Sequence, residues 1–189
     1  MQCNIPKSKI LKTALTLFSS KGYSETKMSE VARKAGISVG ALYLRFSSKQ
    51  ALCLELIKDQ TKDFCKLTET LPDKDPLTAL RKYVHLNLDH AFKKRQLLSM
   101  FIREHKLPFI QPLRTNFFKN QHRLIEDILI RGSKSGVFRH MNTNYTASMI
   151  FASIRGTILL KLIFGVGDTK TLGNSLYKFI INGIGKDAL

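Results

Sequence analysis

The sequence predicts an all-α protein of 189 residues. Along most of the chain apolar residues recur at steps of three and four, as they do on the buried face of a helix. No stretch alternates between apolar and polar residues like a half-buried strand, and no internal repeat stands out. We therefore expect a small N-terminal domain of three helices over residues 1–48 and a larger helical domain over residues 49–189.

The first helix is predicted over residues 7–20, because Ile10, Ala14, Leu17 and Phe18 share one face. Gly22 follows it and ends it.

Two short helices joined by a tight turn are predicted within residues 27–46. Thr26 is expected to cap the first helix, Gly36 to end it with a positive φ, and Ser38 to cap the second. Leu42 and Phe46 lie four residues apart and are expected to face the core. The opposite face begins with small residues, which favours close approach to a major groove. The pattern is therefore typical of a helix-turn-helix DNA reader.

Further helices are predicted over residues 49–71, 77–94, 96–105, about 112–133, 143–164 and 169–183, with Ser48 capping the first of them. Pro108 and Pro112 bracket an irregular stretch before the fourth. The most apolar run, residues 147–166, is long enough to resemble a membrane span, but Arg155 and Lys161 interrupt it. We interpret this run as a buried helix.

Charge and cysteine content narrow the class of protein. The formal net charge is +17, and residues 1–50 hold nine Lys or Arg against two acidic residues. Such a field attracts polyanions, whether nucleic acid or an anionic membrane. Cys3, Cys53 and Cys65 are odd in number and lack metal-type spacing, and the chain opens without a signal-peptide pattern. We expect a cytoplasmic protein.

The stretch GYSETKMSEVARKAGISVGALYLRFSSKQAL, residues 22–52, resembles the N-terminal domain of TetR-type (TetR/AcrR-like) transcriptional regulators. The similarity rests on an Ala-Gly turn, a Ser-x-Gly helix start, and a Tyr, Phe and Lys at steps of three, and it covers about the first third of the chain. Ser29, Leu44 and Arg45 depart from the residues most common at their positions in the family. These departures concern base preference rather than fold.

The resemblance implies a ligand-responsive DNA-binding regulator, commonly a repressor, that binds a near-palindromic operator as a homodimer and is released by a small molecule. It places Tyr43 and Lys49 against the DNA backbone. The residues predicted to contact DNA are Thr26, Lys27, Ser38, Val39, Gly40, Ala41, Tyr43, Leu44, Arg45 and Lys49. The alternative is a non-specific or architectural nucleic-acid-binding protein without effector, whose charge would supply most of the affinity.

The larger domain is rich in aromatic residues, which suits an apolar or aromatic effector. The candidate ligand-binding residues are Phe92, Met100, Phe101, Phe109, Phe117, Phe118, Phe151 and Arg155, although any of the apolar ones can equally fill the core. Arg155 stands within an apolar helix and needs either an acidic partner from the chain or an anionic ligand.

In the TetR family the last two helices commonly pair across a two-fold axis. The candidate dimer residues here are Ala152, Gly156, Leu159, Leu176 and Ile180. The other interpretation is that both helices fill the core of their own subunit.

Catalytic and metal-binding motifs do not stand out. The histidines are His85, His90, His105, His122 and His140, without metal-ligand spacing. The sequence also lacks a nucleophile elbow, a phosphate loop and a dinucleotide fingerprint. We predict that the protein is not an enzyme and needs no metal or cofactor.

Overall fold

The computed structural model describes residues 5–71, 75–104 and 106–186. Over these residues the chain forms nine α-helices and one 3₁₀ turn, and its only strand-like pairing is an isolated bridge between Phe138 and Gly185. The all-α prediction is confirmed.

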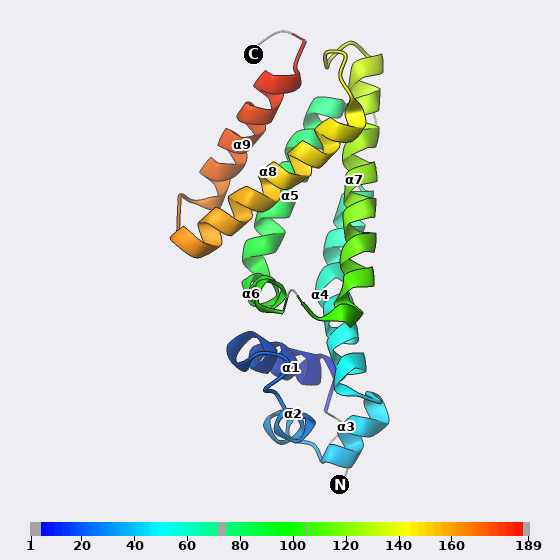
Figure 1. Ribbon diagram of the computed structural model, residues 1–189, viewed down its shortest axis with the longest axis vertical. Coiled ribbons are helices and arrows are strands. Elements are labelled where there is room, and N and C mark those ends of the chain that lie inside the picture. The colour runs from blue at the N-terminus through cyan, green and yellow to red at the C-terminus, as the bar shows by residue number, and fades with distance from the viewer. Residues whose placement is uncertain (1–4, 72–74, 105, 187–189) are drawn as a thin grey trace. The chain divides into compact units, whose positions relative to one another are not determined.

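The elements follow one another with short connections (Figure 1). They are α1 (Lys7–Lys21), α2 (Met28–Ala35), α3 (Val39–Arg45), α4 (Lys49–Glu69), α5 (Pro76–Lys93), α6 (Arg95–Arg103), η1 (Pro108–Ile110), α7 (Gln111–Lys134), α8 (Thr143–Phe164) and α9 (Thr169–Ile184). Each lies within a few residues of its predicted range. The irregular stretch before α7 is the 3₁₀ turn η1, and Pro112 occupies the first turn of α7, where its missing N–H costs no helical hydrogen bond.

The chain divides into two compact units. Unit 1 comprises residues Met1–Asp63 and Lys94–Gln111, and unit 2 comprises Phe64–Lys93 and Pro112–Leu189. The chain therefore passes between the units three times, and α4 contributes its first fifteen residues to unit 1. The predicted boundary at residue 48 separates a DNA-reading part from an effector part, and that functional division stays a prediction.

In unit 1, α1 packs against α2 and α6, and α2 packs against α3. The guanidinium of Arg103 donates to the carbonyl of Ser20 at 2.9 Å, and the N–H of Tyr23 donates to the Glu104 carboxylate at 2.8 Å. The Phe109 ring lies 5.2 Å from the Tyr23 ring. Residues 94–111, expected in the larger domain, thus complete the core of the smaller unit.

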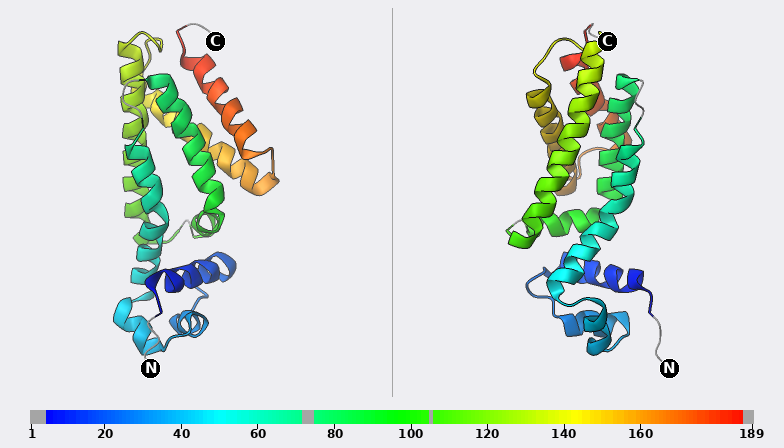
Figure 2. Two further views of the ribbon diagram at one scale, coloured as in Figure 1. Left: turned by 180° about the vertical axis from the view of Figure 1, so that it is seen from behind. Right: turned by 90° about the vertical axis from the view of Figure 1, so that its right-hand side faces the viewer.

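In unit 2, α5 packs against α9 and α8, and α8 packs against α9 (Figure 2). The contact between α5 and α9 depends on a glycine, because a Cβ at Gly173 would lie 2.6 Å from the His85 ring. A second close approach joins Gly132 of α7 to Phe138, whose ring would lie 2.0 Å from an added Cβ.

The helix α8, which we interpreted as a buried helix, is buried on one side within its own chain. Its buried residues are Ala147, Ile150, Ile154 and Ile158, which line only one side. Within the described part of the chain α8 alone has the length and apolar composition of a membrane span, but core helices of soluble proteins share these properties. The other side of α8 is described with the dimer residues below.

Candidate nucleic-acid interface

The helices α2 and α3 form the predicted helix-turn-helix. Val31 and Ala32 are buried on α2, and Gly36 ends this helix at φ +80°, in the left-handed region. The hydroxyl of Ser38 then accepts a hydrogen bond from the N–H of Ala41 at 3.1 Å and caps α3. The roles predicted for Gly36 and Ser38 are confirmed.

Opposite faces of α3 have opposite exposure. Leu42 and Phe46 are buried, which fixes the helix on the core of unit 1. Val39, Tyr43 and Leu44 are exposed by 42%, 48% and 90%. Three large apolar side chains on a seven-residue helix form an apolar surface that folding of the chain leaves open, as at many binding sites.

The remaining predicted contact residues of this region surround that surface. Lys27, Ser38, Gly40 and Arg45 are exposed, Ala41 is half-buried, and the guanidinium of Arg45 donates to the carbonyl of Ile5. A Cβ added at Gly40 would meet no atom within 4 Å. Packing within the chain therefore does not require glycine at this position, although glycine costs a helix about 1 kcal/mol relative to alanine.

The predicted cap at Thr26 is wrong. Its hydroxyl donates to the carbonyl of Gly22 at 2.7 Å, its N–H donates to Tyr23, and α2 begins at Met28 with Lys27 in the cap position. The side chain of Thr26 is fully buried, so its hydroxyl is not on the surface that surrounds α3. Thr26 shapes the turn that precedes α2.

Lys49 closes the same turn. Its ammonium lies 2.8, 3.1 and 3.0 Å from the carbonyl oxygens of Tyr23, Ser24 and Thr26. It also lies 4.4 Å from the centroid of the Tyr23 ring. The three N–H donors of Lys49 are therefore matched by three carbonyl acceptors within unit 1.

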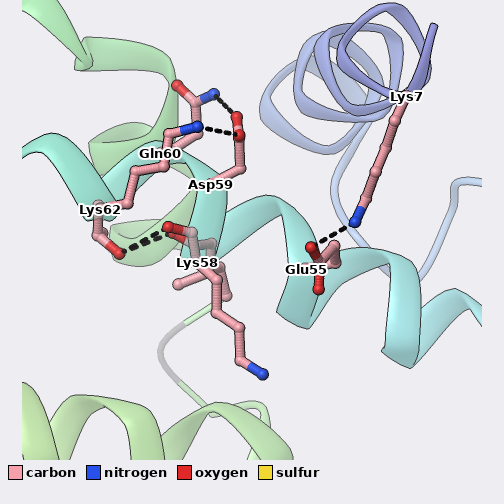
Figure 3. Close-up of polar contacts among 8 residues, drawn as sticks. Lys7, Glu55, Lys58, Asp59, Gln60 and Lys62 are labelled. Atoms are coloured by element: carbon pink, nitrogen blue, oxygen red, sulfur yellow. Dashed lines mark hydrogen bonds and ion pairs between the residues drawn. The ribbon is translucent and has the colours of Figure 1, made fainter.

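A surface groove of about 430 Å³ lies between α1 and the first half of α4 (Figure 3). Its lining carries both signs of charge: Lys7 pairs with Glu55 at 2.6 Å and Lys62 with Asp59 at 3.2 Å, while Lys58 extends away from these pairs. Exposed pairs of this kind contribute about 0.2–1 kcal/mol each, and the groove has no buried polar group aimed into it. We assign it no ligand.

The predicted ligand residues do not gather in one unit. Met100, Phe101 and Phe109 belong to unit 1, because α6 and η1 pack there. Met100 is fully buried and the Phe109 ring contacts the Tyr23 ring at an interplanar angle of 50°, so both help to build that core. A ligand-binding role for these three residues stays a prediction.

Unit 2 brings several of the other candidates together. The guanidinium of Arg155 lies 5.1 Å from the Phe117 ring and 4.9 Å from the Phe151 ring. Phe118 meets Phe151 edge-on at 5.2 Å. Phe92 of α5 has a different cation beside it, since the ammonium of Lys161 lies 5.3 Å from the centroid of its ring.

Two polar residues of α5 that sequence analysis missed complete this cluster. Asn87 is buried and its amide oxygen accepts a hydrogen bond from Arg155 at 3.5 Å. Tyr83 lies one turn before Asn87, is fully buried, and its hydroxyl makes no hydrogen bond to any described residue. Burial raises the pKa of Tyr83 to about 12, although the nearby charge of Arg155 acts to lower it. In the sequence, the four-residue spacing of Tyr83 and Asn87 along an apolar helix was the pattern that could have indicated that both side chains lie on its buried face.

The predicted dimer residues fall on two different faces. Ala152, Gly156 and Leu159 are exposed on the open side of α8. Leu176 and Ile180 are buried, with 8% and 5% exposed, because their side of α9 faces the core of unit 2. Large apolar side chains are also exposed on α8, namely Tyr145, Met149, Leu160, Ile163 and Phe164, and Phe179 is exposed on α9.

Cysteines and metal-type residues add no reactive centre to the parts of the chain that are described. Cys53 and Cys65 are free thiols, and burial raises the pKa of Cys53 to about 12. No cluster of three or more His, Cys, Asp or Glu side chains occurs in these parts. Cys3 and His105 lie outside the described residues.

Residues 10–56 match the family described as "Bacterial regulatory proteins, tetR family". The chain is 28% identical over 145 residues to the uncharacterized HTH-type transcriptional regulator YerO of Bacillus subtilis, and the match covers 73% of this chain and 50% of YerO. The chain thus spans only half the length of that relative.

Two solved structures share the fold over 96% of this chain, each with a TM-score of 0.81. One is a putative transcriptional regulator from Saccharomonospora viridis in complex with choline, 23% identical, with 98% of its chain covered. The other is NalD of Pseudomonas aeruginosa, the secondary repressor of the MexAB-OprM multidrug efflux pump, 24% identical, with 96% of its chain covered. At these identities the likeness shows the fold alone.

Proposed function

Because residues 10–56 match the tetR family of bacterial regulatory proteins, we propose that the chain is a cytoplasmic, ligand-responsive repressor of that family that binds an operator as a homodimer. The observation that carries the proposal is the exposed face of α3, where Val39, Tyr43 and Leu44 remain open to a partner. The N-terminal turn of such a helix commonly contacts base edges in a major groove.

The chemistry of this face supports apolar readout of bases. Gly40 leaves open space beside the start of α3, and Val39 and Leu44 offer methyl groups that suit the methyl of thymine. Arg45 is the side chain suited to a guanine edge or a phosphate, which it reaches by exchanging its bond to Ile5. The hydroxyl of Tyr43 suits a phosphate oxygen.

Lys49 contributes to the same interface by positioning the turn before α2, and the sequence also predicts a phosphate contact for it. Its ammonium already has three carbonyl acceptors, so it positions the turn before α2. A phosphate contact, as we expected from the sequence, would add to this role only if one acceptor were exchanged.

The open side of α8 supports self-association. Ala152 and Gly156 are small and exposed, and a Cβ at Gly156 would meet no atom within 4 Å, which leaves room for a second helix. Leu159 and the flanking apolar side chains supply area to bury. A two-fold pair of readers fits two half-sites about 34 Å apart on the DNA.

Effector binding would shift the equilibrium between a DNA-bound and a DNA-free arrangement of the dimer. A ligand releases DNA only if it binds the DNA-free arrangement more tightly than the DNA-bound one. Choline, the ligand of the Saccharomonospora viridis regulator, is a poor candidate here, because the cation of Arg155 in unit 2 would repel a second positive charge.

A selection of bound sequences from random duplex DNA tests the proposal, followed by titration of the best sequence at physiological salt. We expect a near-palindrome bound at least 10³-fold more tightly than random duplex. Equal affinity for both would reject the regulator and favour the architectural alternative, in which the +17 charge supplies the binding.

Two variants separate backbone contacts from base readout. Tyr43→Phe removes one hydroxyl, so it should weaken selected and random duplex by similar factors. Leu44→Ala should change the selected sequence, because it removes apolar contacts to base edges. An unchanged preference in Leu44→Ala would remove that residue from the reading face.

A further inference from the structure

The cluster around Arg155 in unit 2 contains a half-buried cation without an acidic partner among the described residues. In the ranges that the structure describes, no ion pair involves Arg155, and its one hydrogen bond there is the 3.5 Å contact to the neutral amide of Asn87. The rings of Phe117 and Phe151 flank the guanidinium and compensate part of its lost hydration. The other N–H groups of the guanidinium are therefore available to a ligand.

A second polar group in the same cluster lacks a partner independently of Arg155. The hydroxyl of Tyr83 is fully buried without a hydrogen bond to a described residue, and a buried hydroxyl left in this state costs about 1–3 kcal/mol. Tyr83 keeps its proton near neutral pH, since burial holds its pKa at about 12. Its hydroxyl is therefore a donor without an acceptor in the described chain, close to the guanidinium of Arg155.

We propose that the effector carries a carboxylate, which the guanidinium of Arg155 binds and to which the hydroxyl of Tyr83 donates, with an apolar body against Phe117 and Phe151. This inference rests on the proposed function and names the ligand class of that regulator. A carboxylate presents two oxygens that match the planar guanidinium fork and accept a further bond from a hydroxyl.

The surroundings distinguish this ligand from other anions and from uncharged compounds. One cation and one neutral donor match a single negative charge, whereas a phosphate monoester carries about two charges and needs more donors. An uncharged ligand would leave the guanidinium unneutralised in a largely apolar site. The aromatic rings favour a hydrocarbon body, which a straight alkyl chain and an aromatic ring system both provide.

The test measures binding of acid and alcohol pairs to the full-length protein by isothermal titration calorimetry at pH 7.5. The alkyl pair is decanoate and 1-decanol, and the aromatic pair is 2-naphthoate and 2-naphthol. We expect at least one acid to bind at least tenfold more tightly than its alcohol, and the pair in which this occurs identifies the alkyl or the aromatic source. No binding of either acid, or equal binding of acid and alcohol in both pairs, would overturn the proposal.

Substitutions test whether the preference for the acid over its alcohol depends on Arg155 and Tyr83. Arg155→Met keeps an unbranched side chain without charge and should reduce acid binding to the level of the alcohol, while Tyr83→Phe should weaken the acid by three- to tenfold and leave the alcohol unchanged. Lys161→Met is the matched control, because Lys161 is also a cation of α8 beside a phenylalanine ring. An acid preference that survives in Arg155→Met, or that Lys161→Met abolishes equally, would refute the site.

Folding of each variant is checked by far-UV circular dichroism, and Tyr83→Phe keeps the test valid if Arg155→Met does not fold. DNA binding is measured in parallel, with the acid present and absent. Acid binding that leaves operator affinity unchanged supports the ligand class and contradicts effector control. Specific DNA binding without any acid preference contradicts the ligand class alone.

Discussion

Replacing Lys49 by methionine removes the ammonium and keeps a side chain of similar length. The variant leaves the carbonyl oxygens of Tyr23, Ser24 and Thr26 without their shared donor. A hydrogen bond to a charged group contributes about 1.5–3 kcal/mol. The three bonds share one partly exposed ammonium, so their contributions do not add, and we expect a loss of about 2–3 kcal/mol in the free energy of unfolding.

The assay is equilibrium urea unfolding of the full-length protein, followed by far-UV circular dichroism. Lys58→Met is the matched control on the same helix, because the Lys58 side chain is exposed and points away from the neighbouring ion pairs (Figure 3). That substitution should change the free energy by less than about 0.5 kcal/mol. If both variants unfold at the same urea concentration, the positioning role of Lys49 is wrong.

DNA binding separates positioning from direct contact. A lost phosphate contact lowers the slope of log affinity against log salt by about 0.9. If Lys49 only positions the turn, Lys49→Met weakens binding at all salt concentrations and leaves this slope unchanged.

Further substitutions test packing, thiol accessibility and the reading face. Gly132→Ala should cost about 1–3 kcal/mol of stability, because its Cβ would lie 2.0 Å from the Phe138 ring, whereas Gly183→Ala, with open space around it, should be neutral or stabilising by up to about 1 kcal/mol in urea unfolding. Cys53 should react with a thiol reagent at pH 8 only as fast as the protein opens, since a pKa of about 12 leaves about one thiolate in 10⁴, and peptide mass spectrometry detects faster labelling if this is wrong. Leu44→Ala should leave the urea midpoint within error, because 90% of this side chain is exposed, and a clear shift would indicate a folding role.

Local patterns predicted the helices and most of their ends. Gly36 and Ser38 act through their own backbone or a side chain three residues away, and such short-range effects are readable in a sequence. The cap predicted at Thr26 was wrong because its hydroxyl has a second hydrogen-bonding partner nearby. The turn at Gly22, with φ +98°, presents a carbonyl that the hydroxyl of Thr26 bonds instead of capping α2.

The site residues were less predictable because their partners are distant in sequence. Lys49 meets carbonyls 23 to 26 residues earlier, and Arg155 meets Asn87 across 68 residues. The sequence did indicate that Arg155 needs a partner, since a cation in an apolar helix is costly. Which neutral groups would surround it, Tyr83 among them, depends on how α5, α7 and α8 pack.

Because residues 94–111 belong to unit 1, the DNA-reading part of this chain cannot be transferred to another regulator as a single N-terminal segment. A chimera that joins residues 1–48, or even 1–63, to a foreign effector domain omits the bond from Tyr23 to Glu104 and the bond from Arg103 to Ser20. It also exposes the face of α1 that α6 covers. A transferable reader therefore consists of two segments of the chain, and a recipient must supply a connection from residue 63 to residue 94 and a continuation after residue 111.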